Sequence, residues 1–301
     1  MRCYASADLY NWEDKGLIIP PEPEDPNSSL HPSASMDRPH ILYNQRTKKF
    51  VCWLKIMNRD KTQTETVLTA DHILGPYTKV REGLRPLGMS AGDFDLAVAP
   101  DGKAYYYFER VHSETICADL TDDYTDVTGY YSTHFPHAGP PYVREATAHF
   151  CRKGKHYLVT SGTTGYLPNP SEVAIADTWH GPYTVLGDPH PTDPSHTSFH
   201  SQISSVFQVV GKKDLYIAVA DRWCPQDMDV PYDFTREMFE YLFQGRREEI
   251  PALAERYGIQ RPAGDRERDT SIADYVWLPF RFEGDRPYLD WHDEWRIEDY
   301  E

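Results

Sequence analysis

The segment Lys155-His-Tyr-Leu-Val-Thr-Ser161 opens on a basic residue and continues as a short run of apolar and aromatic side chains. Residues 48–56, 103–109 and 213–220 have the same character, and the four starts lie 52 to 58 residues apart. A repeat of this length is typical of a four-stranded propeller blade. A fifth unit would combine residues 275–280 with the chain ends. The repeat therefore predicts an all-β fold, a five-bladed β-propeller in one domain over residues 1–301.

Two further features refine this architecture. The phrase Gly-Pro-Tyr-Thr occurs at residues 75–78 and again at 181–184, each time after a short predicted strand. Residues 233–258 instead have apolar side chains at helical spacing, with Gly245 and Gly258 as stop signals. We predict a helical hairpin there, within an insert of about residues 228–270. Its charged tail, residues 261–269, is predicted to be a mobile loop.

The composition excludes several classes of protein. The 301 residues carry a formal net charge of −16, which argues against nucleic acid and anionic membranes as partners. The sequence contains no apolar run long enough to cross a bilayer and no signal-peptide core at its start. The five cysteines are scattered, odd in number and without pairs at metal-ligand spacing. This pattern favours reduced thiols and a cytoplasmic chain.

The segment Tyr142-Val-Arg-Glu-Ala-Thr-Ala-His-Phe150 contains the leading catalytic candidate, Glu145. Strict alternation would place Glu145, Thr147 and His149 on one face of a strand. A carboxyl group among apolar neighbours has its charged form disfavoured, so it can act as a general acid. The alternative is a structural glutamate paired with Arg144 or a more distant arginine.

Polar residues stand beside strands of successive predicted blades. The innermost strands of a propeller converge on its axis, so one polar group per blade can meet around one pocket. Cleavage of a glycosidic bond needs an acid to protonate the leaving oxygen and, opposite it, a group that positions water. The candidate phrases are residues 36–44, 92–98, 144–145 and 200–204.

At these positions the chain resembles glycoside hydrolase family 43, and within it the group of exo-β-1,3-galactanases. The resemblance runs from Tyr4 to Trp295, interrupted by the helical insert. Its most specific pieces are Asp37-Arg-Pro-His-Ile-Leu-Tyr-Asn44, Asp101-Gly-Lys-Ala-Tyr105, Leu120-Thr-Asp-Asp-Tyr124, Arg144-Glu-Ala146, Thr160-Ser-Gly162, Asp221-Arg-Trp223 and Tyr275-Val-Trp-Leu-Pro279.

The resemblance implies a five-bladed propeller that hydrolyses an oligo- or polysaccharide with inversion. By motif, Glu145 is the expected general acid and Asp93 the carboxylate that modulates it. Gln202 stands where the galactanase-like group has a glutamine that positions water, and Asp37 stands where that group has Glu. The residues expected to line the sugar site are Thr163, Trp223, Arg222 and Arg38. The chain begins after the strand that holds the family's usual base, so the first blade is expected to have fewer strands.

Other interpretations remain open at this point. Gly88-Met-Ser-Ala-Gly92 matches a nucleophile elbow, but no helical pattern follows Ser90, which disfavours an esterase. The histidines at 190, 196 and 200 lie in a polar loop without a carboxylate at ligand spacing, so we expect no metal from them and no cofactor. A structural calcium or sodium near the axis is left open. The rivals to an enzyme are a non-catalytic sugar-binding propeller and a protein-binding scaffold, and the sequence leaves the oligomeric state open.

Overall fold

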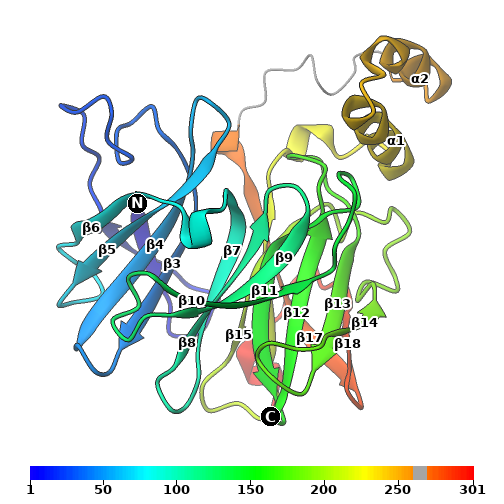
Figure 1. The fold of residues 1–301 in the computed structure, drawn as a ribbon. Helices are drawn as coiled ribbons and strands as arrows, with labels where there is room; N and C mark the ends of the chain where they lie inside the picture. Colours follow the sequence, from blue (N-terminus) through cyan, green and yellow to red (C-terminus); the bar gives the residue numbers. More distant parts are fainter. Residues whose placement is uncertain (260–269) are drawn as a thin grey trace. The chain divides into compact units, whose positions relative to one another are not determined.

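The computed structural model describes residues 1–259 and 270–301, which form an all-β fold with two α-helices (Figure 1). Four of its sheets have four antiparallel strands each, ordered as in the chain, and one sheet has two strands. A sequential four-stranded meander is the connectivity of a β-propeller blade. The predicted fold class is confirmed to this extent, with four blades in the described ranges.

The chain divides into two compact units. The first comprises residues 1–111, 115–134 and 293–301, and the second comprises residues 112–114 and 135–292. The single domain expected from the sequence remains a prediction.

The first unit contains the two-stranded sheet and two blades. Its blades enclose a core in which Trp53, Phe94, Tyr106 and Phe108 are at most 1% exposed. The indole of Trp53 donates to the carbonyl oxygen of Tyr124 at 2.8 Å, so its buried N–H is satisfied. The strands are β1 (Arg2–Ala5) and β2 (Glu13–Leu17), then β3 (Ser35–Asn44), β4 (Lys49–Met57), β5 (Gln63–Ala70) and β6 (Thr78–Leu84), then β7 (Ala91–Val98), β8 (Ala104–Arg110), β9 (Glu114–Leu120) and β10 (Val127–His134).

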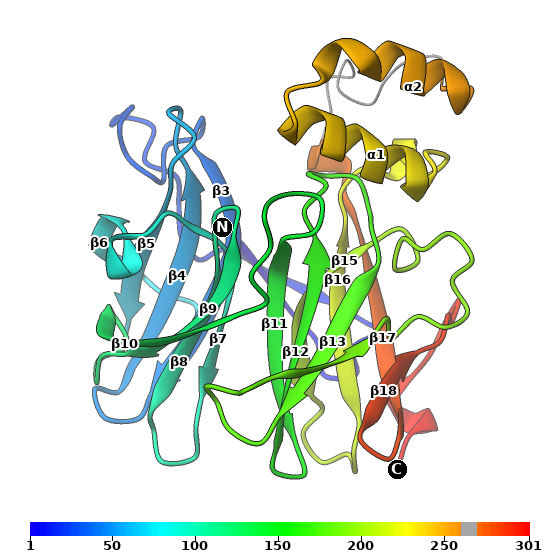
Figure 2. The same ribbon diagram turned by 45° about the vertical axis from the view of Figure 1, so that its right-hand side comes forward.

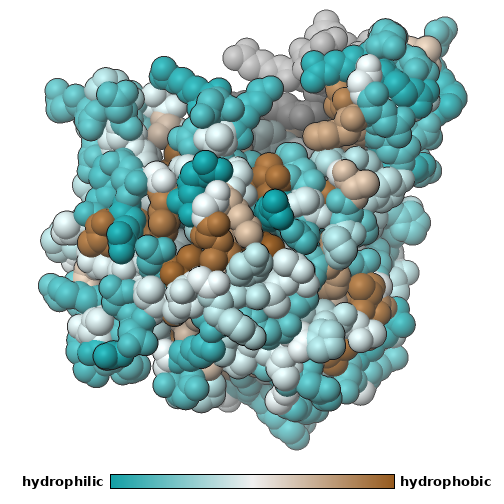
Figure 3. Space-filling model, viewed as in Figure 1, coloured by the Kyte–Doolittle hydropathy of each residue, from teal (hydrophilic) through white to brown (hydrophobic). Residues whose placement is uncertain are grey.

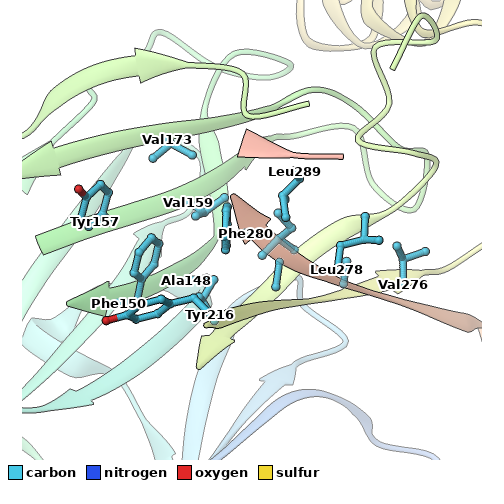
Figure 4. Close-up of a cluster of buried hydrophobic side chains, with 14 of the residues drawn as sticks. Ala148, Phe150, Tyr157, Val159, Val173, Tyr216, Val276, Leu278, Phe280 and Leu289 are labelled. Carbon is cyan, nitrogen blue, oxygen red and sulfur yellow. The ribbon is translucent and has the colours of Figure 1, made fainter. Parts of the chain in front are cut away.

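The second unit contains two blades and the helices. Figure 4 shows its main core, in which side chains of both blades interdigitate around Phe150, Tyr157 and Phe280. The rings of Phe150 and Tyr157 stack at 4.7 Å between centroids across the first two strands. The strands are β11 (Arg144–Arg152), β12 (Lys155–Gly162), β13 (Ser171–Ala176) and β14 (Thr184–Gly187), then β15 (Gln202–Gln208), β16 (Tyr216–Arg222), β17 (Asp274–Glu283) and β18 (Arg286–Leu289).

The sequence repeat corresponds to the second strand of each blade, namely β4, β8, β12 and β16. The repeated Gly-Pro-Tyr-Thr phrase also has one structural position, the connection from the third strand to the fourth. The assignment of residues 275–280 to a fifth unit is wrong. Those residues lie in β17, which pairs with β16 as the third strand of the fourth blade.

The predicted helical hairpin is confirmed as α1 (Tyr232–Phe243) and α2 (Ile250–Arg256). Its apolar side packs on Leu167, in the connection from β12 to β13, through Phe234, Met238 and Leu253. The phenol of Tyr142, two residues before β11, donates to Glu240 on α1. Figure 2 shows both helices beyond one end of β11 and β12.

The surface of the hairpin is mostly hydrophilic on the face drawn in Figure 3. This agrees with an apolar side turned toward the rest of the second unit. The predicted mobile loop at residues 261–269 lies outside the described residues. Within the described ranges, neither helix is long and apolar enough to cross a membrane.

Replacing Phe234 by alanine should detach the hairpin. Phe234 is fully buried, and truncation of such a side chain removes about 3–5 kcal/mol of packing energy. Hydrogen exchange should accelerate in residues 232–256 and 163–168, while β12 stays protected. Phe243→Ala is the matched control, because Phe243 is 53% exposed. Equal acceleration in the two variants would show that Phe234 does not hold the hairpin in place.

Candidate active site

The first strand of each blade holds one residue more than the matching stretch of its partner strand. An extra residue of this kind is a β-bulge, which turns side chains to new directions and is frequent beside active sites. The polar candidates Asp37, Asp93, Glu145 and Gln202 all lie in or next to these bulges. The bulges fall between Asp37 and His40 in β3, Ala91 and Phe94 in β7, Glu145 and Ala148 in β11, and Ile203 and Ser205 in β15.

The bulge in β11 corrects the alternation expected from the sequence. Glu145 pairs with Ser161, and Ala148 pairs with Val159, so two residues of β11 oppose one of β12. Ala146, inside the bulge, has a positive φ of 49°. Because Ser161 and Val159 share a face of β12, Glu145 shares its face with Ala148. His149 therefore lies on the opposite face from Glu145, contrary to the sequence-based expectation.

Gln202 connects Glu145 to an aromatic residue. The indole N–H of Trp223 points at the Gln202 amide from 3.1 Å, and an indole can only donate. The Gln202 atom that faces it must therefore be the oxygen Oε1. The other amide atom, Nε2, then donates to Oε1 of Glu145 at 3.2 Å and to Oγ of Ser161 at 2.9 Å. This network fixes the orientation of the amide and holds the carboxyl group of Glu145.

Aromatic rings lie beside this polar cluster. Trp223 and Tyr166 approach to 5.6 Å between ring centroids, and both line a pocket together with Gln202 and Asp221. A polar network next to aromatic surfaces matches the amphipathic surface of a sugar ring. Leu167, on which the helical hairpin packs, also lines this pocket. The hairpin thus supports the rim of the pocket.

Two predicted sugar contacts have other partners. Arg222 donates through Nη2 to the carbonyl oxygen of Phe199 at 2.9 Å, and so holds the loop that leads into β15. Thr163 is 4% exposed, and its hydroxyl donates to the carbonyl oxygen of Val143 at 3.0 Å. Both residues position the segments that carry Glu145 and Gln202.

The loop before Gln202 is organised by a carboxylate that the sequence analysis did not select. Asp193 accepts backbone N–H bonds from Ser195, Thr197 and Phe199 at 2.8–3.0 Å. Burial alone would raise the pKa of Asp193, but the bond from the Ser195 hydroxyl and the backbone amides lower it overall. An aspartate that caps its own loop resembles an ordinary turn residue in sequence.

The first unit holds its own cluster of charges around Asp93. Oδ2 of Asp93 accepts from Nη2 of Arg38 at 2.8 Å, and Oδ1 accepts from Nζ of Lys55 at 2.5 Å. These three side chains are at most 9% exposed. Nζ of Lys55 is also 3.5 Å from Oδ2 of Asp37. Arg38, predicted to bind sugar, is thus the ion-pair partner of Asp93.

The cations set the charge of Asp93. Burial alone would raise the pKa of this carboxyl, but Arg38 and Lys55 bring the pKa well below its ordinary value. Burial likewise opposes the charge of Lys55, and the carboxylates of Asp93 and Asp37 raise the pKa of Lys55 overall. The four groups form a compact, balanced set of two anions and two cations.

Glu65 is a buried carboxyl in the same unit with the opposite tendency. Its Oε1 accepts from the hydroxyl of Tyr106 at 2.8 Å, and the side chain is fully buried. Burial raises the pKa of Glu65 well above its ordinary value, against smaller opposing effects of Tyr106 and Lys55. Burial therefore favours the protonated, uncharged form of Glu65.

Sequence reasoning did not identify Lys55, Glu65 or Ser161 as part of these clusters. A signal existed for Lys55, since a lone lysine within the apolar run of β4 needs a buried partner. Ser161 gave no such signal, because a serine near a strand end is common.

The two other chemistries considered from sequence find no support in the geometry. Ser90 is followed by β7 rather than by a helix, and its hydroxyl accepts from the backbone N–H of Gln63 at 3.0 Å. Nδ1 of His190 lies 3.0 Å from Oδ1 of Asp188. In the described part of the chain, His190, His196 and His200 belong to no group of three clustered metal ligands.

The charge cluster predicts opposite outcomes for two isosteric substitutions. Asp93→Asn leaves Arg38 and Lys55 buried without their shared anion, and should cost about 3–5 kcal/mol of unfolding free energy at pH 7. Glu65→Gln keeps the shape of a neutral group and an acceptor for Tyr106. Below pH 4.5, where Glu65 of the unfolded chain is also largely protonated, it should change the unfolding free energy by less than about 1 kcal/mol. Urea unfolding measures both.

The pH dependence of the unfolding free energy supplies an independent check of the charges assigned to Asp93 and Glu65. Folding lowers the pKa of Asp93. The ionised Asp93 carboxylate therefore stabilises the folded chain above its ordinary pKa of 3.8, and this stabilisation is lost as the pH falls below 3.8. The difference in unfolding free energy between wild type and Asp93→Asn should therefore become smaller from pH 7 to pH 3. Folding raises the pKa of Glu65, so wild type loses stability as the pH rises above 4.5. Glu65→Gln should therefore become more stable relative to wild type over that range. Parallel stability curves for wild type and both variants would contradict these assignments.

Comparison with known proteins gives similar solved structures and a family match. A search of curated protein sequences finds no significant match. A solved family 43 β-1,3-galactosidase is 25% identical, with a TM-score of 0.75 over 99% of this chain and 54% of its own. A second one, solved with galactodeoxynojirimycin, is 24% identical, with a TM-score of 0.75 over 98% of this chain and 86% of its own.

An exo-β-1,3-galactanase from Phanerochaete chrysosporium, solved with galactose, is 21% identical, with a TM-score of 0.70 over 96% of this chain and 56% of its own. The chain thus spans about half the length of two of these three proteins. Residues 1–237 match the family described as Glycosyl hydrolases family 43. Because this match covers more than half of the chain, the protein belongs to glycosyl hydrolase family 43.

Proposed function

We propose that this chain hydrolyses glycosidic bonds with inversion and releases galactose from the end of a β-1,3-linked galactan. The observation that carries the proposal is the network in which Gln202 joins the carboxyl group of Glu145 to the indole of Trp223 at a pocket. Support for the substrate comes from the similar structures, which are β-1,3-galactosidases and an exo-β-1,3-galactanase.

Glu145 is the proposed general acid. The departing sugar oxygen needs a proton as its bond to carbon breaks, and a carboxylic acid within hydrogen-bond reach supplies it. Gln202 restrains Glu145 through Oε1, so the carboxyl group meets the substrate in one orientation. The rings of Trp223 and Tyr166 present apolar surface for the face of the sugar.

Gln202 acts here as a positioning residue for the acid. An inverting enzyme places its acid and its water-activating group about 6.5–9.5 Å apart, with the sugar between them. Gln202 instead contacts Glu145 directly, at 3.2 Å. The water-positioning role implied by the family resemblance would require substrate to part the two side chains, and that role remains a prediction.

Asp93 and Asp37 are proposed for the same reaction on the family resemblance alone. With Arg38 and Lys55 bound to it, Asp93 is an anion at neutral pH and cannot serve as the proton donor. It would therefore act by its charge, as a modulator or as an acceptor for sugar hydroxyls. This division of roles leaves the acid function to Glu145.

The count of five blades is also part of this proposal. Four blades have four strands, and the two-stranded sheet of β1 and β2 would be the fifth, shorter one. A crystal structure in which β1 and β2 pair onto one of the four blades would exclude it.

Glu145→Gln tests the acid role, because it keeps the shape and removes the transferable proton. On β-1,3-galactobiose, kcat should fall by roughly 10²–10⁴-fold, the usual contribution of acid–base assistance. On a dinitrophenyl galactoside, whose phenolate leaves without a proton, the loss should be much smaller. The basic limb of the pH–rate profile should disappear. Proton NMR of the first product formed gives its anomeric configuration and so tests inversion.

Glu283→Gln is the matched control, since Glu283 is an exposed end residue of β17 paired with Arg281. It should leave both rates unchanged. Equal losses on both substrates in Glu145→Gln would assign Glu145 to binding. Retained sugar binding without turnover of any glycoside by the wild type would establish the non-catalytic alternative.

Gln202→Glu tests the positioning role. A second carboxylate beside Glu145 disfavours ionisation of the acid by like-charge repulsion. The basic limb of the kcat/KM profile should therefore move upward by roughly one pH unit or more. A fall in kcat with an unmoved basic limb would show instead that Gln202 acts on the water.

A further inference from the structure

A second group of reactive side chains lies on the second unit, at the far end of the β11–β12 hairpin from Glu145. Cys151 pairs directly across the two strands with His156, and His149 precedes Cys151 by two residues on the same strand. Phe150 and Tyr157 point into the apolar core, as Figure 4 shows. Strand alternation therefore directs all three side chains to the opposite face of the sheet.

The ligand atoms of these side chains form a tight triangle. Nε2 of His149 is 3.2 Å from Nδ1 of His156, and Sγ of Cys151 is 3.3 Å from Nδ1 of His156 and 3.9 Å from Nε2 of His149. A tetrahedral zinc ion, with bonds of about 2.0–2.1 Å to nitrogen and about 2.3 Å to sulfur, separates its ligand atoms by roughly 3.3 Å for N–N and 3.6 Å for N–S. The observed distances between the three ligand atoms match the distances expected around a tetrahedral zinc ion.

The surroundings leave one side of the triangle open. The indole of Trp179, in the connection from β13 to β14, lies 4.9 Å from the His149 ring and 4.4 Å from the His156 ring. The two histidines are 6% and 8% exposed, whereas Cys151 is exposed. A wall of apolar ring surface with one open side is the setting of an ion that has three protein ligands and a fourth place for water.

We propose that His149, Cys151 and His156 bind a divalent cation of borderline softness, of which Zn²⁺ is the representative. Two imidazole nitrogens and a thiolate are the ligands that Zn²⁺ accepts, whereas Ca²⁺ and Mg²⁺ prefer oxygen. On binding, the thiol of Cys151 loses its proton to solvent and the sulfur forms a bond to the metal. This site is distinct from the calcium or sodium left open near the propeller axis. It differs from the sequence-based expectation of no metal ligands, because the spacing His-x-Cys-x₄-His joins two strands and matches no single-loop metal motif.

The metal would cross-link the two strands of the β11–β12 hairpin. It would tie the end of β11 to the start of β12, with Trp179 packed beside it. Glu145 lies four residues from His149 and six from Cys151 along β11, roughly 13–20 Å at the rise of a strand, so the ion would not touch the candidate active site. The expected consequence is greater thermal stability of the zinc-loaded chain, since an ion that binds only the folded state stabilises it.

The test uses the full chain stripped of metal with a chelator and then titrated with Zn²⁺ alone. Wild type should bind one equivalent, its melting temperature should rise by several degrees, and its affinity should fall more than about 100-fold in Cys151→Ser. Co²⁺ gives a second readout, because a thiolate–cobalt bond has a charge-transfer absorption that must vanish in Cys151→Ser. Metal-free Cys151→Ser should match wild type in circular dichroism, since Cys151 is exposed.

Cys3→Ser is the matched control, because Cys3 is a partly exposed cysteine in the other unit. It should keep the zinc stoichiometry, the cobalt absorption and the thermal shift. Zinc should also protect Cys151, but not Cys3, from alkylation by iodoacetamide. Absence of zinc binding by wild type, or equal zinc affinity in Cys151→Ser and Cys3→Ser, would overturn the proposal and leave a hydrogen-bonded histidine pair beside a thiol. These readouts do not depend on glycosidase activity, so they stand or fall separately from the proposed function.

Discussion

The extra residue in the first strand of each blade is the constraint on which the rest of the structure depends. The second strands β4, β12 and β16 pair with their third strands in a regular register, so the extra residue of the first strand is accommodated as a bulge in that strand. In β11 the bulge turns Glu145 to the face that meets Gln202. The same bulge turns His149 and Cys151 to the other face, beside His156. One local irregularity therefore separates the candidate acid Glu145 from the candidate metal site along one strand.

The carboxyl groups of the two units are held by different kinds of donor. Asp93 lies between a guanidinium and an ammonium group, and these charges keep it ionised. Glu145 instead accepts a hydrogen bond from the neutral amide of Gln202. The environment of Asp93 therefore suits a permanent anion.

The helical hairpin links the loop that lines the pocket of the second unit to the segment that precedes β11. Tyr142, near Glu145, donates to α1, and Leu167, in the connection after Ser161, lies in the apolar core of the hairpin. Both loops are also tied by Thr163, whose hydroxyl donates to the carbonyl oxygen of Val143. The insert thus supports segments that would otherwise be long surface loops, whose positions are ordinarily the least constrained in a domain.

The sequence by itself located one strand of each four-stranded blade and the helical hairpin. Runs of apolar and aromatic residues at a repeat of 52 to 58 residues marked the second strand of these four blades, and a 3.6-residue period marked the hairpin, because both signals depend only on neighbours along the chain. The motifs also named Glu145, Gln202 and Trp223, which the structure joins in one network. Tertiary structure decided what these residues contact. Strand register placed residues 275–280 in the fourth blade, and the bulge at Ala146 reversed the face of Glu145 relative to His149. Lys55, Ser161 and Cys151 acquired their roles from partners on other strands, which no local pattern encodes, because a bulge or a cross-strand pair exists only once the neighbouring strand is in place.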